Sequence, residues 1–150
     1  MQIISKQLIL LSLILLLSHT VAADTLTGRP SRIISGDKLV LTTGEKQHLE
    51  IQLLGIQAPP LKSRWGRAAR KQLSALVAGR PVSVEYNIRN RWGRPLGKVF
   101  LGDSDISLRL LESGLATHRP GFQTLKDNNL YSQAMHKAKS LRLGIWSGVK

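Results

Sequence analysis

Short stretches in which polar and apolar residues alternate make up much of the first half of the chain. This pattern is typical of strands that are buried on one face. It predicts strands at residues 25–34, 39–42 and 48–56. In the third strand His48, Glu50 and Gln52 share one face, because successive side chains point to opposite sides of a strand. We expect Gly36 to adopt a positive φ in the turn between the first two strands.

A helical period replaces the alternation after Pro60. Apolar residues recur at helical spacing from Trp65 to Val77, and Ser63 is well placed to cap the helix N-terminus. We therefore predict a helix over residues 63–78 that ends at Gly79.

The rest of the chain predicts one hairpin and two more helices. The hairpin strands, residues 82–86 and 97–101, flank a basic and aromatic tip at residues 90–94. The helices are predicted at residues 107–113 and 125–140. For the last helix we expect an inner stripe formed by Leu130, Ala134, Ala138 and Leu141.

The order of these elements predicts an α+β fold. Five short strands, a helix inserted after the third strand and helices at the end are typical of a small five-stranded Greek-key barrel of the OB type, here with about three helices. We expect one domain over residues 24–150, which is long enough to bury a core. The chain contains no cysteine, so neither a disulfide bond nor a thiolate site contributes.

The first 23 residues have the pattern of a signal peptide. Lys6 precedes an apolar run at residues 8–17, and the small residues Ala22 and Ala23 provide a cleavage site. The run is about half the ~20 residues that a membrane span requires, so a cleaved signal fits better than the alternative of an uncleaved anchor. We expect an exported protein, periplasmic or secreted, that begins at Asp24.

The remaining chain is strongly basic. Residues 24–150 contain 21 lysines and arginines against nine acidic residues, a net charge of +12. Such an excess favours polyanionic partners: nucleic acid first, with anionic lipid or cell-wall polymer as alternatives.

Several motifs, in order, resemble the staphylococcal nuclease-like (thermonuclease) family. The strongest is LLGIQAPP at residues 53–60 followed by WGRAAR at residues 65–70, where family members read approximately LLGIDAPE before a helix. Further matches are the Gly36-Asp37 turn, RWGR at residues 91–94, ESGLA at residues 112–116 and GIW at residues 144–146. The resemblance implies an OB-type barrel and calcium-dependent hydrolysis of phosphodiesters.

The resemblance also implies a catalytic layout of two aspartates and a carbonyl for calcium, a glutamate for water and two arginines for phosphate. Asp37 matches the first aspartate, and Arg94 matches the second arginine. Gln57, Pro60 and Gln52 stand in place of the second aspartate, the glutamate and the first arginine. Gln57 is a neutral ligand, a proline cannot act as a base, and Gln52 brings no full charge to the transition state.

One carboxylate on the third strand is a speculative replacement. Glu50 shares a face with Gln52, although a solvated carboxylate is the alternative interpretation. The catalytic candidates are thus Arg94, as a phosphate contact, and Glu50. The metal candidate is Asp37, with Gln57 as a weak neutral ligand. The cofactor is then calcium or another divalent cation held weakly, or the protein uses none.

A basic and aromatic surface remains as a candidate nucleic-acid interface. Trp92 can stack on a base while neighbouring arginines neutralise phosphates. The candidate contacts are Arg64, Arg67, Arg91, Trp92 and Arg94. The loop at residues 118–122 is a further candidate, with Phe122 as a stacking face.

These observations leave three hypotheses for function. The leading one is an exported thermonuclease-like domain, expected to be a monomer, that binds nucleic acid or a similar phosphate-rich polymer and has reduced or lost nuclease activity. The second is an active metal-dependent phosphodiesterase with a rewired site. The third is a non-catalytic envelope protein that binds anionic polymer or lipid.

Overall fold

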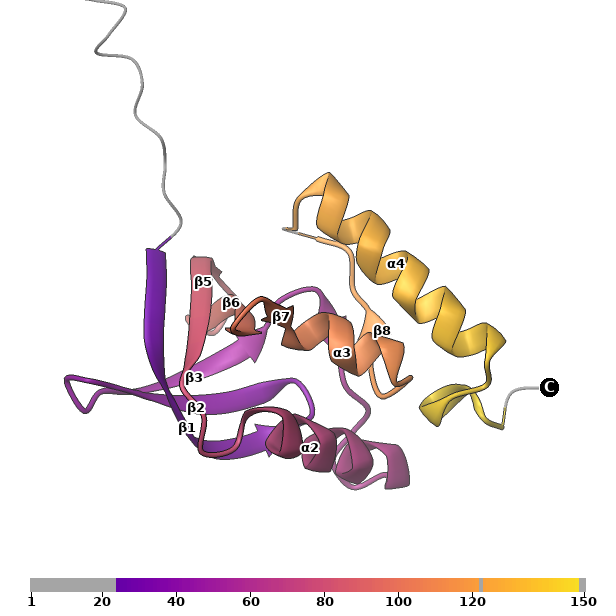
Figure 1. Ribbon diagram of the computed structural model, residues 1–150, viewed down its shortest axis with the longest axis horizontal. Coiled ribbons are helices and arrows are strands. Elements are labelled where there is room, and N and C mark those ends of the chain that lie inside the picture. The colour runs from indigo at the N-terminus through magenta and orange to yellow at the C-terminus, as the bar shows by residue number, and fades with distance from the viewer. Residues whose placement is uncertain (1–23, 122, 149–150) are drawn as a thin grey trace, which may run out of the picture.

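The computed structural model of the protein describes residues 24–121 and 123–148 (Figure 1). The predicted signal peptide at residues 1–23 and the predicted stacking residue Phe122 lie outside this range. Across the described residues, no helix is long and apolar enough to cross a membrane.

Five strands form a closed barrel. They are β1 (Asp24–Ser35), β2 (Lys38–Thr43), β3 (His48–Leu53), β5 (Val82–Arg89) and β6 (Pro95–Leu101). Their order is β3-β2-β1-β5-β6, with every neighbouring pair antiparallel. The barrel closes where β3 pairs in parallel with β6, at Gln52 with Leu96 and Leu53 with Gly97. The predicted α+β barrel of the OB type is confirmed.

Three α-helices, three two-residue strands and a short 3-10 helix, η1 (Gly144–Trp146), complete the described part of the chain. The helices are α2 (Arg64–Val77), α3 (Ile106–Glu112) and α4 (Leu125–Ser140). The short strands are β4 (Ile56–Gln57), β7 (Ser104–Asp105) and β8 (Thr117–His118). β7 extends the barrel sheet beside β6, whereas β4 and β8 pair with each other. In Figure 1, α2 lies across one end of the barrel and α3 lies between the strands and α4.

The core lies inside the barrel and under the helices. The strands contribute Leu39, Leu41, Ile51, Leu53, Val84 and Val99, all at most 1% exposed. The helices contribute Ala69, Leu73, Val77, Leu110 and Leu111. Full burial of one such leucine, isoleucine or valine contributes about 1.5–3 kcal/mol. The cap of α2 is the predicted one, since Gly66 N donates a 3.0 Å hydrogen bond to Ser63 Oγ.

Two predicted boundaries differ from the structure. The third strand was expected to continue to Ile56, but β3 ends at Leu53. Gly55 has a φ of 81°, which turns the chain before it resumes as β4. The hairpin strands are longer than predicted, because β5 continues to Arg89 and β6 begins at Pro95.

The positive φ predicted for Gly36 is wrong. Among the described glycines, those with positive φ are at positions 55, 79, 93, 102, 114 and 144. Gly36 is required for a different reason: a Cβ atom there would lie 2.4 Å from Ala69 Cβ and 2.8 Å from Ala58 Cβ. The absence of a side chain lets α2 and the loop after β4 pack directly against the turn that carries Asp37.

The inner stripe predicted for α4 is wrong at both of its leucines. Ala134 and Ala138 are buried, but Leu130 and Leu141 are 41% and 59% exposed. Tyr131, one position after Leu130, is fully buried instead. The prediction chose the stripe by apolar character alone and therefore missed Tyr131, because the burial of this tyrosine depends on a polar partner from a distant strand.

That partner is Asp105, at the end of β7. The Tyr131 hydroxyl donates a 2.5 Å hydrogen bond to Asp105 Oδ2, and burial together with the Asp105 charge raises the pKa of Tyr131 above its ordinary value. Lys98 Nζ lies 3.0 Å from Asp127 Oδ1 and 4.0 Å from Asp105 Oδ2. This network connects α4 to the barrel and thereby fixes the segment that precedes α4.

The close packing at Gly36 can be tested with a matched pair of glycine substitutions. Gly36→Ala should lower the free energy of unfolding by about 1–3 kcal/mol, because the new methyl group overpacks a filled site. Gly44→Ala should change it by less than about 0.5 kcal/mol, since no atom lies within 4 Å of the added Cβ. Urea denaturation of both variants makes the comparison, and equal effects would contradict the packing argument.

Candidate functional site

A cleft of about 400 Å³ lies where the end of β3, β4, the β5–β6 hairpin tip and the loop after β8 meet. Its polar and aromatic lining includes Asp37, Lys38, Gln52, Gln57, Trp92 and Arg119. We call it the Asp37 cleft. Two long-range pairings create it: β3 with β6 closes the barrel, and β4 with β8 brings residues from either half of the chain together.

Asp37 is buried, with 7% of its surface exposed, and both of its carboxylate oxygens accept hydrogen bonds. Ser35 Oγ donates to Oδ1 over 2.6 Å, and Ala58 N donates to Oδ2 over 3.2 Å. The carboxylate therefore links the β1–β2 turn to the segment after β4. This role is structural whether or not a ligand is bound.

Gln57, the predicted weak metal ligand, is bound by a guanidinium group. Arg119 Nη1 donates a hydrogen bond to Gln57 Oε1. Arg119 N also donates a 2.8 Å hydrogen bond to Gly55 O, which fixes the start of the loop after β8. The side-chain oxygen that the resemblance places toward calcium thus faces a cation supplied by the protein itself.

These residues do not fit a calcium site. Calcium takes six to eight oxygen ligands, and carboxylates are prominent among them. Within residues 24–121 and 123–148, no three histidine, aspartate or glutamate side chains are grouped so that they could hold a metal ion. Asp37 is the one carboxylate in the described lining of the cleft, and the Gln57 oxygen already accepts a hydrogen bond from the positively charged Arg119.

Two other substituted positions serve local structure. Pro60 O accepts hydrogen bonds from Ser63 Oγ over 2.7 Å and from Ser63 N over 2.9 Å, so this segment forms the turn that starts α2. Gln52 Oε1 accepts a 3.0 Å hydrogen bond from Asn90 Nδ2. Gln52 therefore anchors the hairpin tip instead of presenting a charge to a phosphate.

Arg94 and Glu50, the two catalytic candidates, contact each other. Arg94 Nε lies 2.8 Å from Glu50 Oε1, and the two side chains are 40% and 32% exposed. A pair as exposed as this contributes at most about 1 kcal/mol. The described lining of the Asp37 cleft includes neither residue. The carboxylate offsets part of the charge that Arg94 would bring to a phosphate.

The hairpin tip presents Trp92 to solvent. Asn90 Oδ1 accepts hydrogen bonds from Trp92 N over 2.9 Å and from Arg94 N over 3.1 Å, which holds the turn. Trp92 is 65% exposed, and Arg91 Cζ lies 4.1 Å from the centroid of its ring. An exposed indole at a cleft can stack on a flat ring such as a base. The guanidinium that lies over this indole can contact an anionic group of the same ligand.

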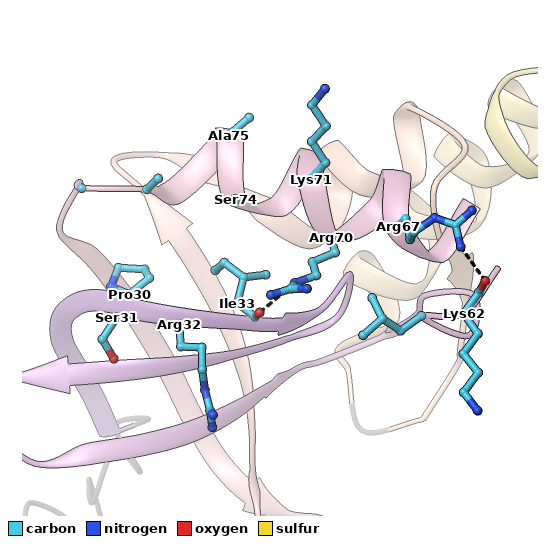
Figure 2. Close-up of a pocket in the computed structure, with 13 residues that line it drawn as sticks. Pro30, Ser31, Arg32, Ile33, Lys62, Arg67, Arg70, Lys71, Ser74 and Ala75 are labelled. Carbon is cyan, nitrogen blue, oxygen red and sulfur yellow. Dashed lines mark hydrogen bonds between the residues drawn. The ribbon is translucent and has the colours of Figure 1, made fainter. Parts of the chain in front are cut away.

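The remaining candidate contacts, Arg64 and Arg67, lie on α2. Arg64 Cζ is 4.7 Å from the centroid of the Trp65 ring. Arg67 Nη1 donates a 2.6 Å hydrogen bond to Lys62 O (Figure 2). The structure therefore does not bring all the candidates together: of the nucleic-acid candidates, Trp92 alone is in the described lining of the Asp37 cleft.

Lys38 and Arg119 were missed as site residues. Lys38 follows Asp37 directly and was interpreted only as a turn residue. The loop at residues 118–122 was recognised as a possible ligand contact, but Phe122 was chosen within it. The available signal was Arg119, a cation in the same loop as Phe122. Its hydrogen-bond partner Gln57 lies 62 residues earlier in the chain.

The sequence is similar to a known protein family and to several known proteins. The model of the family described as "Staphylococcal nuclease homologue" matches residues 50–148. An uncharacterized endonuclease of Escherichia coli O157:H7 is 29% identical over 131 residues, which are 87% of this chain and 83% of that protein.

Two further relatives differ in their described roles. A succinoglycan biosynthesis protein of Rhizobium meliloti (strain 1021) is 33% identical over 145 residues, with 88% of this chain and 71% of that protein covered. A probable staphylococcal-like nuclease of Oryza sativa subsp. japonica is 29% identical over 97 residues, or 65% of this chain and 25% of that protein. The family match covers more than half of the chain and agrees with the barrel and the ordered motifs, so this protein belongs to the family of staphylococcal nuclease homologues.

Proposed function

We propose that this protein is an exported member of its family that binds nucleic acid, or a similar phosphate-rich polymer, with nuclease activity that is reduced or lost. The observation that carries the proposal is the contact between Arg119 and Gln57. A guanidinium group is bonded to the residue that stands in place of a metal-binding aspartate. The cleft that would otherwise hold calcium thereby becomes a cleft with cationic side chains of its own.

Loss of activity follows from what phosphodiester hydrolysis requires. The reaction needs a group that positions or deprotonates water and charges that stabilise the transition state. Pro60 supplies no base, and Gln52 bonds to Asn90. Family members are generally calcium-dependent, whereas this cleft has one carboxylate whose two oxygens already accept hydrogen bonds. Each missing group costs orders of magnitude in rate, although such losses are not additive.

Binding requires less than cleavage does. Lys38 and Arg119 give the cleft two cations against the single carboxylate of Asp37, and Trp92 adds an exposed stacking face. Base stacking on an aromatic side chain contributes about 1–3 kcal/mol, and the backbone phosphates release counterions when cations contact them. The net charge of +12 on residues 24–150 draws polyanions to this surface.

A second candidate function is a rewired phosphodiesterase. The 2.8 Å contact between Arg94 and Glu50 favours it, because a carboxylate lies beside the guanidinium expected to contact phosphate. In that case Asp37 would hold a divalent cation weakly and Glu50 would take the part of the missing carboxylate. The separation of this pair from the lining of the Asp37 cleft favours the binding protein instead.

Stacking on Trp92 provides the first test of the proposal. Trp92→Ala should weaken binding of single-stranded DNA by about fivefold to 150-fold, the equivalent of about 1–3 kcal/mol. Leu141→Ala, which removes an exposed apolar side chain from the end of α4, should leave the affinity unchanged. Fluorescence anisotropy with a labelled oligonucleotide measures both. A silent Trp92→Ala variant would favour an envelope protein that binds polyanions without stacking.

Calcium provides the second test. Millimolar calcium should shift the melting temperature by less than about 1 °C, whereas a site filled at 100 times its Kd would add about 2.7 kcal/mol of stability. Asp37→Asn should destabilise the protein equally with and without calcium, because the carboxylate has a structural role. A calcium-dependent rise in melting temperature that Asp37→Asn abolishes would support the rewired enzyme.

A further inference from the structure

A second cavity, larger than the Asp37 cleft, lies between α2 and β1 (Figure 2). Its volume is about 1040 Å³, and the two cavities share no lining residue. β1 contributes residues 30–33, and α2 with its flanking loops contributes the remainder. We call this cavity the basic groove.

The lining of the basic groove carries positive charge only. Its charged residues are Arg32, Lys62, Arg67, Arg70 and Lys71. The sequence explains this asymmetry, since residues 25–36 and 58–84 contain no aspartate or glutamate. The acidic residues of the chain lie in other segments. The positive charges that line the groove are therefore not neutralised by a carboxylate of the lining. Clustered charges of one sign in a concave surface concentrate the field and attract the opposite charge.

Two of these cations are part of the framework. Arg70 Nε donates a 3.0 Å hydrogen bond to Ile33 O, which joins α2 to β1, and Arg67 Nη1 donates to Lys62 O. Figure 2 shows Arg70 reaching from α2 toward the Ile33 carbonyl of β1. A guanidinium has five N–H donors, so each of these arginines keeps donors for a ligand.

The other three cations are exposed and available. Across residues 24–121 and 123–148, no ion pair involves Arg32, Lys62 or Lys71. In Figure 2 the side chains of Arg32 and Lys62 extend to the same side, one from β1 and one from the loop before α2. Lys71 extends from α2 to the opposite side. Arg32 and Lys62 thus present cations from two segments on one side of the groove, where successive anionic groups of one polymer could contact them.

The apolar part of the lining indicates how the ligand would be held. It consists of small or aliphatic residues, namely Pro30, Ile33, Leu61, Ala75 and Ala78. The described lining contains no aromatic ring, so stacking of bases, as expected at Trp92, has no counterpart here. Leu61 is the one large apolar side chain of the lining that is exposed, at 39%, and a membrane-binding face normally presents several. The groove is therefore suited to bind a ligand through contacts between its cations and phosphate groups.

We propose that the basic groove binds the sugar–phosphate backbone of a nucleic acid, at a site separate from the Asp37 cleft and without regard to base sequence. This inference rests on the proposed function and deepens it. The cleft and hairpin tip would contact bases, and the groove would contact phosphates of the same or a second strand. The footprint of the protein then extends over two surfaces.

The test compares two double variants that remove the same charges. Arg32→Gln/Lys62→Gln alters the groove, whereas Lys137→Gln/Arg142→Gln alters exposed residues at and just beyond the C-terminal end of α4, neither of which forms an ion pair in the described part of the chain. Anisotropy with a labelled DNA duplex of about 20 base pairs is recorded between about 50 and 200 mM salt. The groove variant should lose about tenfold in affinity per cation near 0.1 M salt, and its slope of log K against log salt should fall by about 1.8. The control should lose less than about threefold.

Each other result overturns the proposal. Equal losses in the two variants would mean that net charge alone governs binding, and no loss in either would mean that the groove is not used. A third arm measures binding to phosphatidylglycerol vesicles. If the groove variant loses vesicle binding while its affinity for duplex DNA is unchanged, the groove is a site for lipid headgroups and the nucleic-acid assignment is wrong.

The same data separate this inference from the proposed function. If the unaltered protein binds neither duplex nor single-stranded DNA, binding of DNA as its proposed function fails together with the groove proposal. If Trp92→Ala weakens single-stranded DNA binding while the groove variant behaves like its control, the groove proposal alone fails. Circular dichroism melting curves of both double variants confirm that the substitutions leave the fold intact.

Discussion

The parallel pairing of β3 with β6 is the contact on which the arrangement of the Asp37 cleft depends. It closes the barrel at Gly97, which lies tightly between the two neighbouring strands: a Cβ there would lie 2.5 Å from Val84 Cγ1 on β5 and 3.3 Å from Ile51 Cγ2 on β3. Leu54 N donates a 2.9 Å hydrogen bond to Gly97 O just beyond the paired residues. This closure places Gln52 beside Asn90, which in turn organises the hairpin tip that carries Trp92.

Positions that serve catalysis in the implied layout serve structure in this protein. Asp37 joins a turn to a loop, Gln52 anchors the hairpin tip, and Pro60 starts a helix. Hydrogen bonds of this kind contribute about 0.5–1.5 kcal/mol each to the stability of the fold. A fold can persist while its site changes, because function lies in a few side chains and stability in the whole core. The curated relatives, which include both endonucleases and a succinoglycan biosynthesis protein, are consistent with this view.

Local patterns predicted most of the fold, whereas contacts between distant segments could not be predicted. The cap of α2 and both ends of α4 follow from residues adjacent in sequence. The β4–β8 pair consists of two residues on each side, too short for any periodicity, and it is this pair that brings Arg119 to Gln57. Gly36 was misinterpreted and Tyr131 was missed for the same reason, since each is explained by a partner more than 20 residues away. The basic groove likewise depends on the packing of α2 against β1, which no single segment encodes.

We propose that the barrel is retained for binding after the catalytic groups were replaced. Cleavage of labelled single-stranded DNA by the purified protein, with calcium, magnesium, manganese or a chelator, is the decisive measurement. Arg94→Ala is assayed in parallel, because Arg94 is the surviving phosphate-contact arginine of the implied layout. We expect little or no metal-dependent cleavage by either protein under conditions in which the DNA is bound. Metal-dependent cleavage that disappears in Arg94→Ala would contradict it and would show that the site has been rebuilt around other residues.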